Sequence, residues 1–422
     1  MNIRMSIILS TGIIMARYGY DQMNPTLWLI LLLVMTSMAI VLRKWIQSQC
    51  ILFYICLFLL GGLLTSYQEC RNRKPVTYFT MDELSEQDWF LTTAQERRAE
   101  IEQKLKGLGI ENEDFGVIAA MAMGDKTALD KDTKEVYSVA GASHVLAVSG
   151  LHISIIFQLL IMLLGGNRRH IFVILSALVA IWMYVLFIGM PASAVRSATM
   201  LSVYGFVTMT RRNKNSLRSL SIAFTIMLLC NPLYLFDLSF QMSFAAVGSI
   251  IVFLPLLSSL YHPTHRLSQW IWGMLCVSAA AQIGALPLIT YYFGRISCYS
   301  LLTTFIAIPA AMGILYLCCM LMLMSPFLLL SPTVSLFSWL ITWVAKALVV
   351  ITHFANTAFH LTSLTPGASI DGIHLPLPIL FIIYAALGLV YAGWIKMKRI
   401  RNKMARSQED FSPENALFTN YR

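Results

Sequence analysis

The chain has 422 residues, of which 57% are hydrophobic and only 12% are charged, and its mean hydropathy is +0.68. Soluble domains carry roughly 25% charged residues, so this composition excludes an ordinary soluble enzyme and indicates an integral membrane protein. The formal net charge is +10 at pH 7, and the positions of the cations decide what that charge means.

Apolar runs long enough to cross about 30 Å of hydrocarbon as an α-helix recur through most of the sequence. They lack the residue-by-residue alternation of a membrane β-barrel. We therefore predict an all-α polytopic membrane protein with about 12 transmembrane helices. Arg17 follows the first run without a small-residue cleavage pattern, so we expect a retained helix rather than a signal peptide. The expected spans are 5–19, 26–42, 50–66, 145–165, 171–189, 193–210, 219–234, 239–258, 270–292, 299–324, 332–352 and 376–395.

The orientation follows from the cations, because short loops rich in Lys and Arg stay on the cytoplasmic side. The cationic clusters at 43–44, 168–169, 211–218 and 396–406 share one side if both termini are cytoplasmic. Residues 67–143 then lie outside, with 10 Lys and Arg against 15 Asp and Glu, while the rest of the chain carries 21 against 6. The net charge therefore indicates membrane topology rather than a nucleic-acid-binding surface.

Four regions follow from these expectations: N-terminal transmembrane helices at 1–66, an acidic extracytoplasmic segment at 67–143, a larger transmembrane domain at 144–395 and a basic cytoplasmic tail at 396–422. The extracytoplasmic segment is a short helical insertion. Its apolar residues at three- and four-residue steps predict an amphipathic helix within 91–108, lying on the outer leaflet or on the bundle. Two shorter helices are expected at 115–123 and 131–140, ending at Gly124 and Gly141.

The most specific feature is the run GASHVLAVSGLHISII at 141–156, where a membrane helix begins. Small residues there permit close helix packing, and serine hydroxyls bond back to their own helix, so packing accounts well for the serines. Histidines at membrane depth are costly and usually face a polar cavity or a partner. The run therefore predicts a functional or gating role, and its candidate site residues are Ser143, His144, Ser149, Gly150 and His152.

Four further blocks of sequence are informative when they are considered together. They are GDKTALDKDTKEVYSVAGASHVLAVSGLHISII (124–156), MPASAVRSATM (190–200), NPLYLFDLSFQMSFAAVGSI (231–250) and AQIGALPLITYYFGRIS (281–297). Together they resemble the ComEC competence proteins, an inner-membrane channel family that admits single-stranded DNA during transformation. The resemblance implies that 144–395 is a channel domain in the cell inner membrane, that the chain passes single-stranded DNA into the cytoplasm, and that it is not an enzyme.

The polar residues of these blocks become candidates for the substrate path. Arg196, four residues into its span, is expected to face a water-filled path or to meet Asp237. Asp237 is equally expected to cap the helix that follows it. The remaining candidates are amides and a hydroxyl at membrane depth, which usually hydrogen-bond across helices: Gln241, Ser243 and Gln282.

The chain also departs from the family. Residues 67–113 are too few and too acidic for the family's outer OB-like domain, and no His-x-His-x-Asp-His run marks its metallo-β-lactamase-like domain. We expect no cofactor, since the eight cysteines lack metal-ligand spacing and no Walker loop occurs. Beyond DNA and the lipid bilayer, the expected partners are a separate DNA receptor, a nuclease, and a cytosolic ATPase or DNA-binding protein.

Two other functional classes stay open. A transporter of another solute that is coupled to protons would need intramembrane carboxylates, and only Asp237 is expected at that depth. An intramembrane hydrolase would use Ser149 as nucleophile and His152 as base. Two side chains three residues apart on one helix rarely reach that geometry, and no third orienting group is evident. Lys346 and His353, seven residues apart, would extend a cationic lining or reach the membrane surface.

Overall fold

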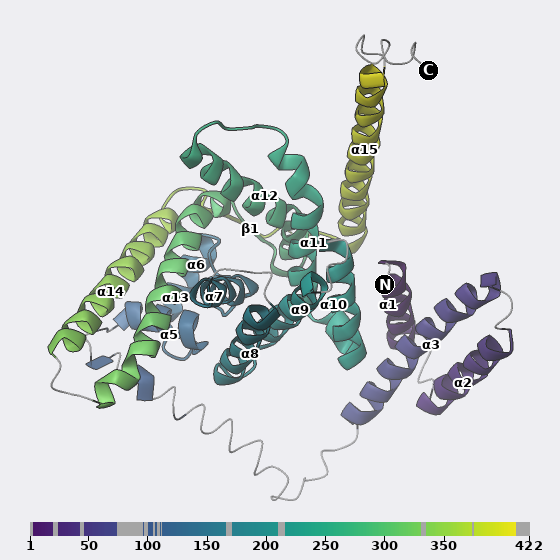
Figure 1. Ribbon diagram of the computed structural model, residues 1–422, viewed down its shortest axis with the longest axis horizontal. Coiled ribbons are helices and arrows are strands. Elements are labelled where there is room, and N and C mark those ends of the chain that lie inside the picture. The colour runs from purple at the N-terminus through teal and green to yellow at the C-terminus, as the bar shows by residue number, and fades with distance from the viewer. Residues whose placement is uncertain are drawn as a thin grey trace, which may run out of the picture. The chain divides into compact units, whose positions relative to one another are not determined.

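The computed structural model describes residues 3–19, 24–42, 46–73, 96, 100–103, 106–107, 110, 112–165, 171–209, 216–330, 335–373 and 375–410. Most of them are helical (Figure 1). The elements are α1 (Ile3–Tyr18), α2 (Pro25–Val41), α3 (Ile46–Arg73), α5 (Asn112–Met123), α6 (Lys131–Val139), α7 (Gly150–Leu163), α8 (Ile171–Phe187), α9 (Ala192–Met209), α10 (Ser216–Cys230), η1 (Pro232–Phe236), α11 (Leu238–Ser258), α12 (Arg266–Phe293), β1 (Arg295–Ser297), α13 (Ser300–Leu330), α14 (Ser335–Ser363), β2 (Ser369–Asp371) and α15 (Leu377–Asp410).

A helix stands at each of the expected spans, so the all-α prediction is confirmed at that level. Several boundaries differ: α14 continues to Ser363 rather than ending near residue 352, and α7 begins at Gly150 rather than near residue 145. The preceding backbone turns instead, with the Val145 amide donating to the Ala142 carbonyl at 2.9 Å. The amphipathic helix predicted at 91–108 lies mostly outside the described residues, although Glu96, 100–103 and 106–107 are helical.

The prediction of about 12 membrane crossings is confirmed only in part. Among the described residues, six helices are long and apolar enough to cross a membrane: Gln49–Asn72, Leu238–Ser258, Arg266–Phe293, Ser300–Met324, Trp339–Ser363 and Leu377–Lys398. The other apolar helices are shorter, from 14 residues in α7 to 17 in α2 and α8. At 1.5 Å per residue they measure roughly 21–26 Å, which is less than the hydrocarbon thickness.

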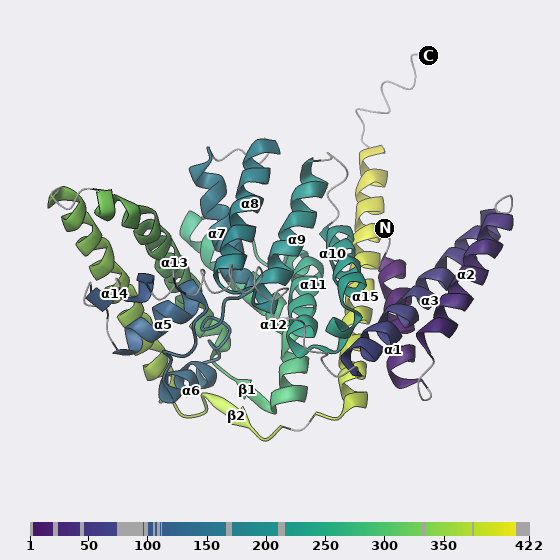
Figure 2. The ribbon, with the colours of Figure 1, turned by 90° about the horizontal axis from the view of Figure 1, so that it is seen from below.

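The chain divides into two compact units: unit 1 (Met1–Phe244 and Ser297–Ser369) and unit 2 (Ala245–Ile296 and Ile370–Arg422). In unit 1, α13 and α14 lie side by side as a long helical hairpin, and α7, α8 and α9 are mutual neighbours (Figures 1 and 2). In unit 2, α12 contacts α15. The two three-residue strands β1 and β2 pair with each other, and they contain the only strand residues in the described part of the chain.

The short helices α5 and α6, which the charge pattern predicts to be extracytoplasmic, are part of a core of unit 1. Residues 117–123 of α5 are at most 5% exposed, and they share a hydrophobic cluster with Tyr137 of α6 and with α13 and α14. The Tyr137 ring meets the Phe359 ring of α14 edge-on, with ring centroids 4.7 Å apart. Burial of this apolar surface fixes α5 and α6 against the α13–α14 hairpin, directly before the chain enters the 141–156 run.

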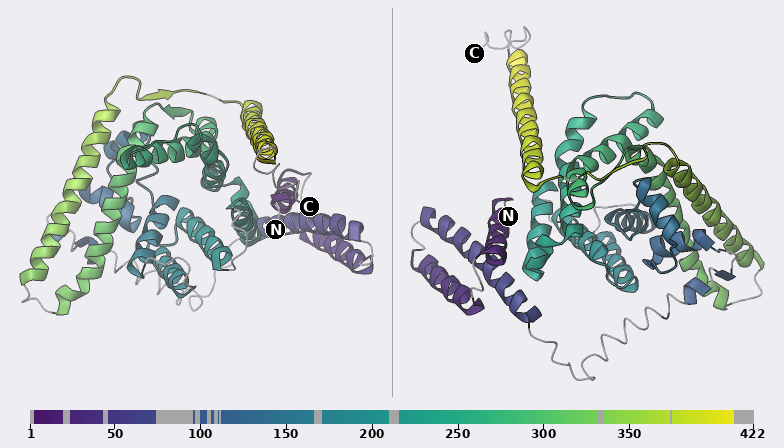
Figure 3. Two further views of the ribbon diagram at one scale, coloured as in Figure 1. Left: turned by 45° about the horizontal axis from the view of Figure 1, so that its top comes forward. Right: turned by 180° about the vertical axis from the view of Figure 1, so that it is seen from behind.

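Small residues allow α1 and α2 to approach α3 closely, and Figure 3 shows the three helices together. A Cβ on Gly12 would collide with the Phe58 carbonyl, and a Cβ on Gly61 would lie 2.6 Å from the Leu9 carbonyl oxygen. A Cβ on Gly62 would lie 2.5 Å from the Trp28 ring. Without these glycines the helix axes would have to separate, which would break the van der Waals packing on which helix association in a membrane depends.

The substitution Gly12→Ala tests this packing. We expect it to lower the free energy of unfolding by about 1–3 kcal/mol, since the added methyl group meets backbone rather than a flexible side chain. The measurement is the thermal unfolding midpoint of the purified protein in detergent. Gly273→Ala in α12 is the matched control, because nothing lies within 4 Å of its Cβ position. Equal midpoints for the two variants would contradict the close-packing argument.

Candidate functional site

The turn segment, residues 140–149, connects α6 to α7 and lies outside regular helix. Hydroxyl groups from two other helices hold its backbone, and a hydroxyl of β1 holds the last residue of α6. Thr303 of α13 donates to the Ala140 carbonyl at 2.8 Å, and Ser193 of α9 donates to the Val148 carbonyl at 2.5 Å. Ser297 donates to the Val139 carbonyl at 3.0 Å. Irregular backbone in a membrane protein persists only where such groups are satisfied by protein or water, so these hydroxyls stabilise the turn segment.

Gly141 sets the path of the turn segment. Its φ of +77° lies in the left-handed region, which a residue with a Cβ adopts only at a cost. A Cβ here would lie 2.7 Å from the Ser297 hydroxyl oxygen and 2.7 Å from the Ser300 Cβ. Glycine is therefore required twice over at this position, for its backbone conformation and for the approach of α13.

Ser149 and His152 form a hydrogen-bonded pair at the start of α7. The Ser149 hydroxyl oxygen is 2.8 Å from His152 Nδ1, and the Ser149 amide nitrogen is 3.4 Å from the same atom. A backbone N–H can only donate, so Nδ1 accepts, the serine hydroxyl donates to it, and the proton of the neutral ring is on Nε2. Among the described residues, the fully buried His152 Nε2 has no hydrogen-bond partner.

This pair is at hydrogen-bonding distance, although serine and histidine three residues apart on one helix were expected rarely to reach nucleophile-to-base geometry. That expectation assumed that both residues lie within the helix. Ser149 is instead the N-cap, with extended backbone (φ −110°, ψ 174°), and this conformation turns its side chain over the first helical turn. The part of the chain that the structure describes brings no carboxylate into hydrogen-bonding contact with His152, so the pair has the form of a helix cap.

Two other residues of the run point elsewhere. The side chains of Ser143 and His144 are exposed on the turn segment. His144 still exerts an electrostatic effect on His152, so the structure places the two histidines near each other. Gly150 is the first residue of α7, and a Cβ there would lie 2.8 Å from the Ser197 hydroxyl oxygen of α9. The glycine therefore allows α7 to start directly against α9.

Arg196 of α9 is only 3% exposed. Its Nη2 donates to the hydroxyl of Ser239, in the first turn of α11, whereas its Nε and Nη1 have no hydrogen-bond partner among the described residues. Sequence reasoning missed Ser239, because an ordinary serine at a helix start gives no sign of a partner 43 residues away. The buried guanidinium is therefore satisfied at one nitrogen only.

Asp237 does not form the ion pair with Arg196 that was one of its two expected roles. It attracts the guanidinium electrostatically, but its Oδ1 accepts the Phe240 amide at 3.0 Å and so caps α11. Gln241 donates to the Leu235 carbonyl at 3.0 Å, and Ser243 is partly buried on the same helix. Gln282 is partly buried on α12 in unit 2.

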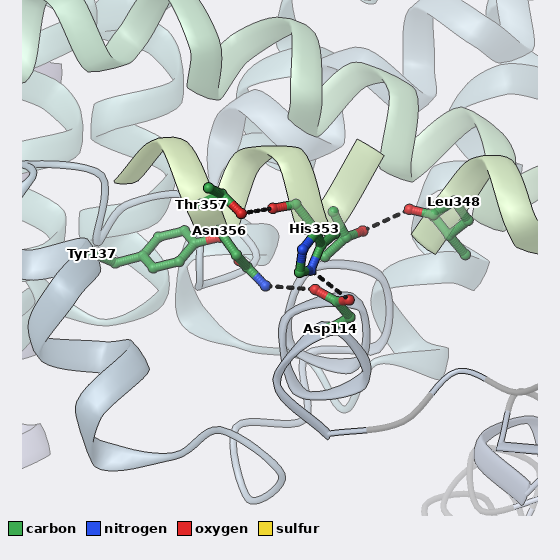
Figure 4. A network of polar contacts seen from close by, with 7 residues as sticks. Asp114, Tyr137, Leu348, His353, Asn356 and Thr357 are labelled. Atoms are coloured by element: carbon green, nitrogen blue, oxygen red, sulfur yellow. Dashed lines mark hydrogen bonds and ion pairs between the residues drawn. The ribbon is translucent and has the colours of Figure 1, made fainter. Parts of the chain in front are cut away.

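A second polar cluster joins α5, α6 and α14, and we call it the clasp: Asp114, Tyr137, His353 and Asn356. Figure 4 shows the Asp114 carboxylate facing both α14 residues, with Asn356 Nδ2 at 2.8 Å and His353 Nδ1 at 3.5 Å. The Tyr137 hydroxyl donates to Asn356 Oδ1 at 2.6 Å. Burial, together with the negative charge of Asp114, raises the pKa of Tyr137, so this hydroxyl remains a donor at neutral pH.

The clasp corrects two expectations. His353 meets a carboxylate instead of extending a cationic lining with Lys346, whose ammonium lies over the Trp343 ring. Asp114 also contacts the candidate span Trp339–Ser363, so Asp237 is not the only carboxylate beside such a helix. No sequence pattern indicates this contact, because Asp114 and Asn356 are 242 positions apart.

These contacts join helix ends that the charge pattern puts on one side of the membrane. The starts of α7 and α9 meet through Val148 and Ser193, and the starts of α9 and α11 meet through Arg196 and Ser239. The end of α6 meets the start of α13 at Thr303. The candidate residues of unit 1 therefore gather at one end of its helices, which the charge pattern predicts to be the outer end.

The fold and these contacts define a polytopic helical membrane protein with buried polar side chains where its helices begin. A sequence model of the family described as Competence protein matches residues 121–397. The chain belongs to this competence protein family, as the four sequence blocks indicated.

Two curated relatives are similar to the chain. ComE operon protein 3 of Bacillus subtilis (strain 168) is 30% identical over 253 residues, which is 57% of this chain and 30% of that protein. Recombination protein 2 of Haemophilus influenzae (strain ATCC 51907 / DSM 11121 / KW20 / Rd) is 24% identical over 233 residues, which is 51% of this chain and 28% of that protein. The chain thus matches less than a third of the length of either relative. No solved structure matches it.

The substitution Asn356→Leu tests the clasp. It removes the amide between Tyr137 and Asp114, and each buried polar group left without a partner costs about 1–3 kcal/mol. We expect a lower thermal unfolding midpoint in detergent and faster proteolysis between α5 and α7. Thr357→Val is the matched control, since that exposed hydroxyl bonds only to the His353 carbonyl of its own helix. Indistinguishable behaviour of the two variants would contradict a stabilising clasp.

Proposed function

We propose that the chain forms the membrane passage through which single-stranded DNA enters the cytoplasm during natural transformation. The observation that carries the proposal is the family match over 121–397, because this range includes the turn segment, Arg196 and the start of α11. Both terminal segments are taken to be cytoplasmic, and the membrane to be the cell inner membrane. In this proposal the chain conducts DNA and does not cut it.

The geometry of the turn segment supports this proposal. A strand of nucleic acid cannot pass between closed apolar helices, so a passage needs polar atoms where it enters the membrane. Irregular backbone at membrane depth is tolerated where it is buried in protein or lines a water-filled cavity, so it is compatible with such a passage. The turn segment supplies both, with exposed Ser143 and His144 and with carbonyl groups held by hydroxyls. The glycine at 141 and the N-cap at 149 fix where this irregular stretch begins and ends.

The proposed function also requires other proteins. The sequence has no Walker loop, so a cytosolic ATPase or DNA-binding protein would supply the pull. A separate receptor would deliver DNA to the outer end, and a separate nuclease would remove the complementary strand. The alternative is that the chain transports another solute. In that case, deletion of its gene would leave DNA uptake unchanged.

Deletion and complementation test the function directly. We expect a deletion strain to lose uptake of transforming DNA and the wild-type gene to restore it. Gly141→Ala should fail to restore it, since the added methyl group meets Ser297 and Ser300. Gly367→Ala is the matched control, because its φ of +75° carries the same backbone cost but nothing lies within 4 Å. Immunoblots of the membranes verify equal protein levels. Normal uptake in the deletion strain would refute the proposal.

The Ser149–His152 hydrogen bond gives the intramembrane hydrolase a specific observation in its favour. A nucleophilic serine would react with a fluorophosphonate probe, whereas a capping serine whose histidine lacks a carboxylate partner would not. We expect no labelling of the purified protein at Ser149. Labelling that disappears in Ser149→Ala would establish a hydrolase instead. Helix capping alone predicts that this variant loses about 0.5–2 kcal/mol of stability.

A further inference from the structure

Helix α15 is longer than its membrane-spanning part. It continues without a break from Leu377 to Asp410 (Figure 1), whereas its apolar candidate span ends at Lys398. The Trp394 ring stacks on the Tyr391 ring with centroids 6.1 Å apart, and the Lys398 ammonium lies 5.1 Å from the Trp394 ring centroid. Aromatic rings beside a cation are typical of the boundary between membrane and water, and the charge pattern puts this boundary on the cytoplasmic side.

Three large apolar side chains are exposed beyond this boundary, and we call them the methionine stripe: Met397, Ile400 and Met404. They are 65%, 45% and 64% exposed, and steps of three and four residues put them on one face of α15. At 1.5 Å per residue, Ile400 and Met404 lie roughly 9 and 15 Å beyond Trp394 along the helix axis. The headgroup layer is only about 5–8 Å thick on each side, so both side chains reach the aqueous phase.

The same part of α15 is strongly basic. Residues 396–406 include six Lys and Arg and no Asp or Glu. Lys396 and Lys398 are exposed, and they are the direct neighbours of Met397 in the sequence, so they lie on either side of the methionine stripe. An apolar stripe within a basic helix is typical of a segment that binds a membrane surface or the groove of an acidic protein.

The position of the methionine stripe decides between the possible occupants. Lipid tails do not reach Ile400 and Met404 on a helix that continues out of the membrane. A nucleic acid would pair with the cations but would leave the apolar side chains in water. A second copy of this chain, packed with its α15 in parallel, would bring like charges together. A groove with an apolar floor and carboxylates along its edges matches both the stripe and the cations.

We propose that the part of α15 beyond Trp394 docks into an apolar, carboxylate-edged groove of a cytosolic protein. This inference rests on the proposed function, which places this end of α15 in the cytoplasm and requires a cytosolic protein to pull the strand. Side chains at i, i+3 and i+7 are the usual anchors of a helix in such a groove, and methionine adapts its shape to the floor. Docking here would hold the pulling protein at the inner end of the passage.

Complementation of the deletion strain tests the docking. Met404→Glu sets a carboxylate against the edges of the groove and removes a buried anchor, so we expect uptake of transforming DNA to fall by about tenfold. Met404→Leu is the matched control, because it keeps an apolar anchor and should restore uptake fully. Immunoblots and the unfolding midpoint in detergent should be the same for both variants, since the side chain is exposed in the free chain. Full uptake with Met404→Glu would overturn the proposal.

Photocrosslinking in living cells identifies the occupant. We expect Met404→p-benzoylphenylalanine to give a light-dependent adduct with a cytosolic protein, identified by mass spectrometry, and the added substitution Ile400→Glu to reduce its yield about tenfold. Leu389→p-benzoylphenylalanine is the matched control, because Leu389 is 74% exposed within the candidate span and should not give this adduct. Support requires both this adduct and the loss of uptake in Met404→Glu. An adduct with a second copy, with lipid or with nucleic acid, or no adduct at all, would overturn the docking.

The two proposals fail in different ways. If the deletion strain takes up DNA normally, the passage itself is wrong, whatever crosslinks to position 404. If deletion abolishes uptake but Met404→Glu restores it fully, the passage stands and only the docking is wrong.

Discussion

Backbone that leaves the helical state inside a membrane protein must find hydrogen-bond partners within the protein, and the turn segment meets this constraint with side-chain hydroxyls. Thr303 and Ser193 reach its carbonyl groups from α13 and α9, and Ser297 fixes the end of α6. The Thr303 and Ser193 hydroxyls each join the segment to a helix distant in sequence. The positions of α7, α9 and α13 in unit 1 are therefore coupled through one irregular stretch of chain.

This coupling sets the chemistry at the start of α7. Because the helix begins at Gly150 rather than earlier, Ser149 becomes an N-cap and holds the imidazole of His152 in one tautomer. Because Gly150 lacks a side chain, the start of α7 comes into contact with Ser197 of α9, while the neighbouring Arg196 is buried and reaches Ser239 of α11. A buried guanidinium with two nitrogens lacking partners is tolerated only where the rest of the structure determines its position or where a ligand completes it.

The clasp stabilises the helices that precede the turn segment. Asp114 and Tyr137 converge on Asn356, so the short helices α5 and α6 are held to α14 by polar contacts as well as by apolar burial. A polar network with unpaired groups would destabilise this contact. Here the Asp114 carboxylate and the Asn356 amide have hydrogen-bond partners. The last turn of α6 thereby enters the turn segment from a fixed direction.

The sequence by itself determined the class of protein and the approximate position of each long helix, since apolar runs of membrane length and cationic loops are local properties of the chain. It also indicated the 141–156 run and Arg196, because polar side chains stand out in an apolar stretch. Only the tertiary structure decided which of these groups meet. The partners of Arg196 and Asp114 are 43 and 242 positions away, and an ordinary serine or asparagine carries no mark of its partner. The start of α7 was misplaced for the same reason: apolar composition continues through 145–149, while hydrogen bonds from distant hydroxyls hold that backbone in turns.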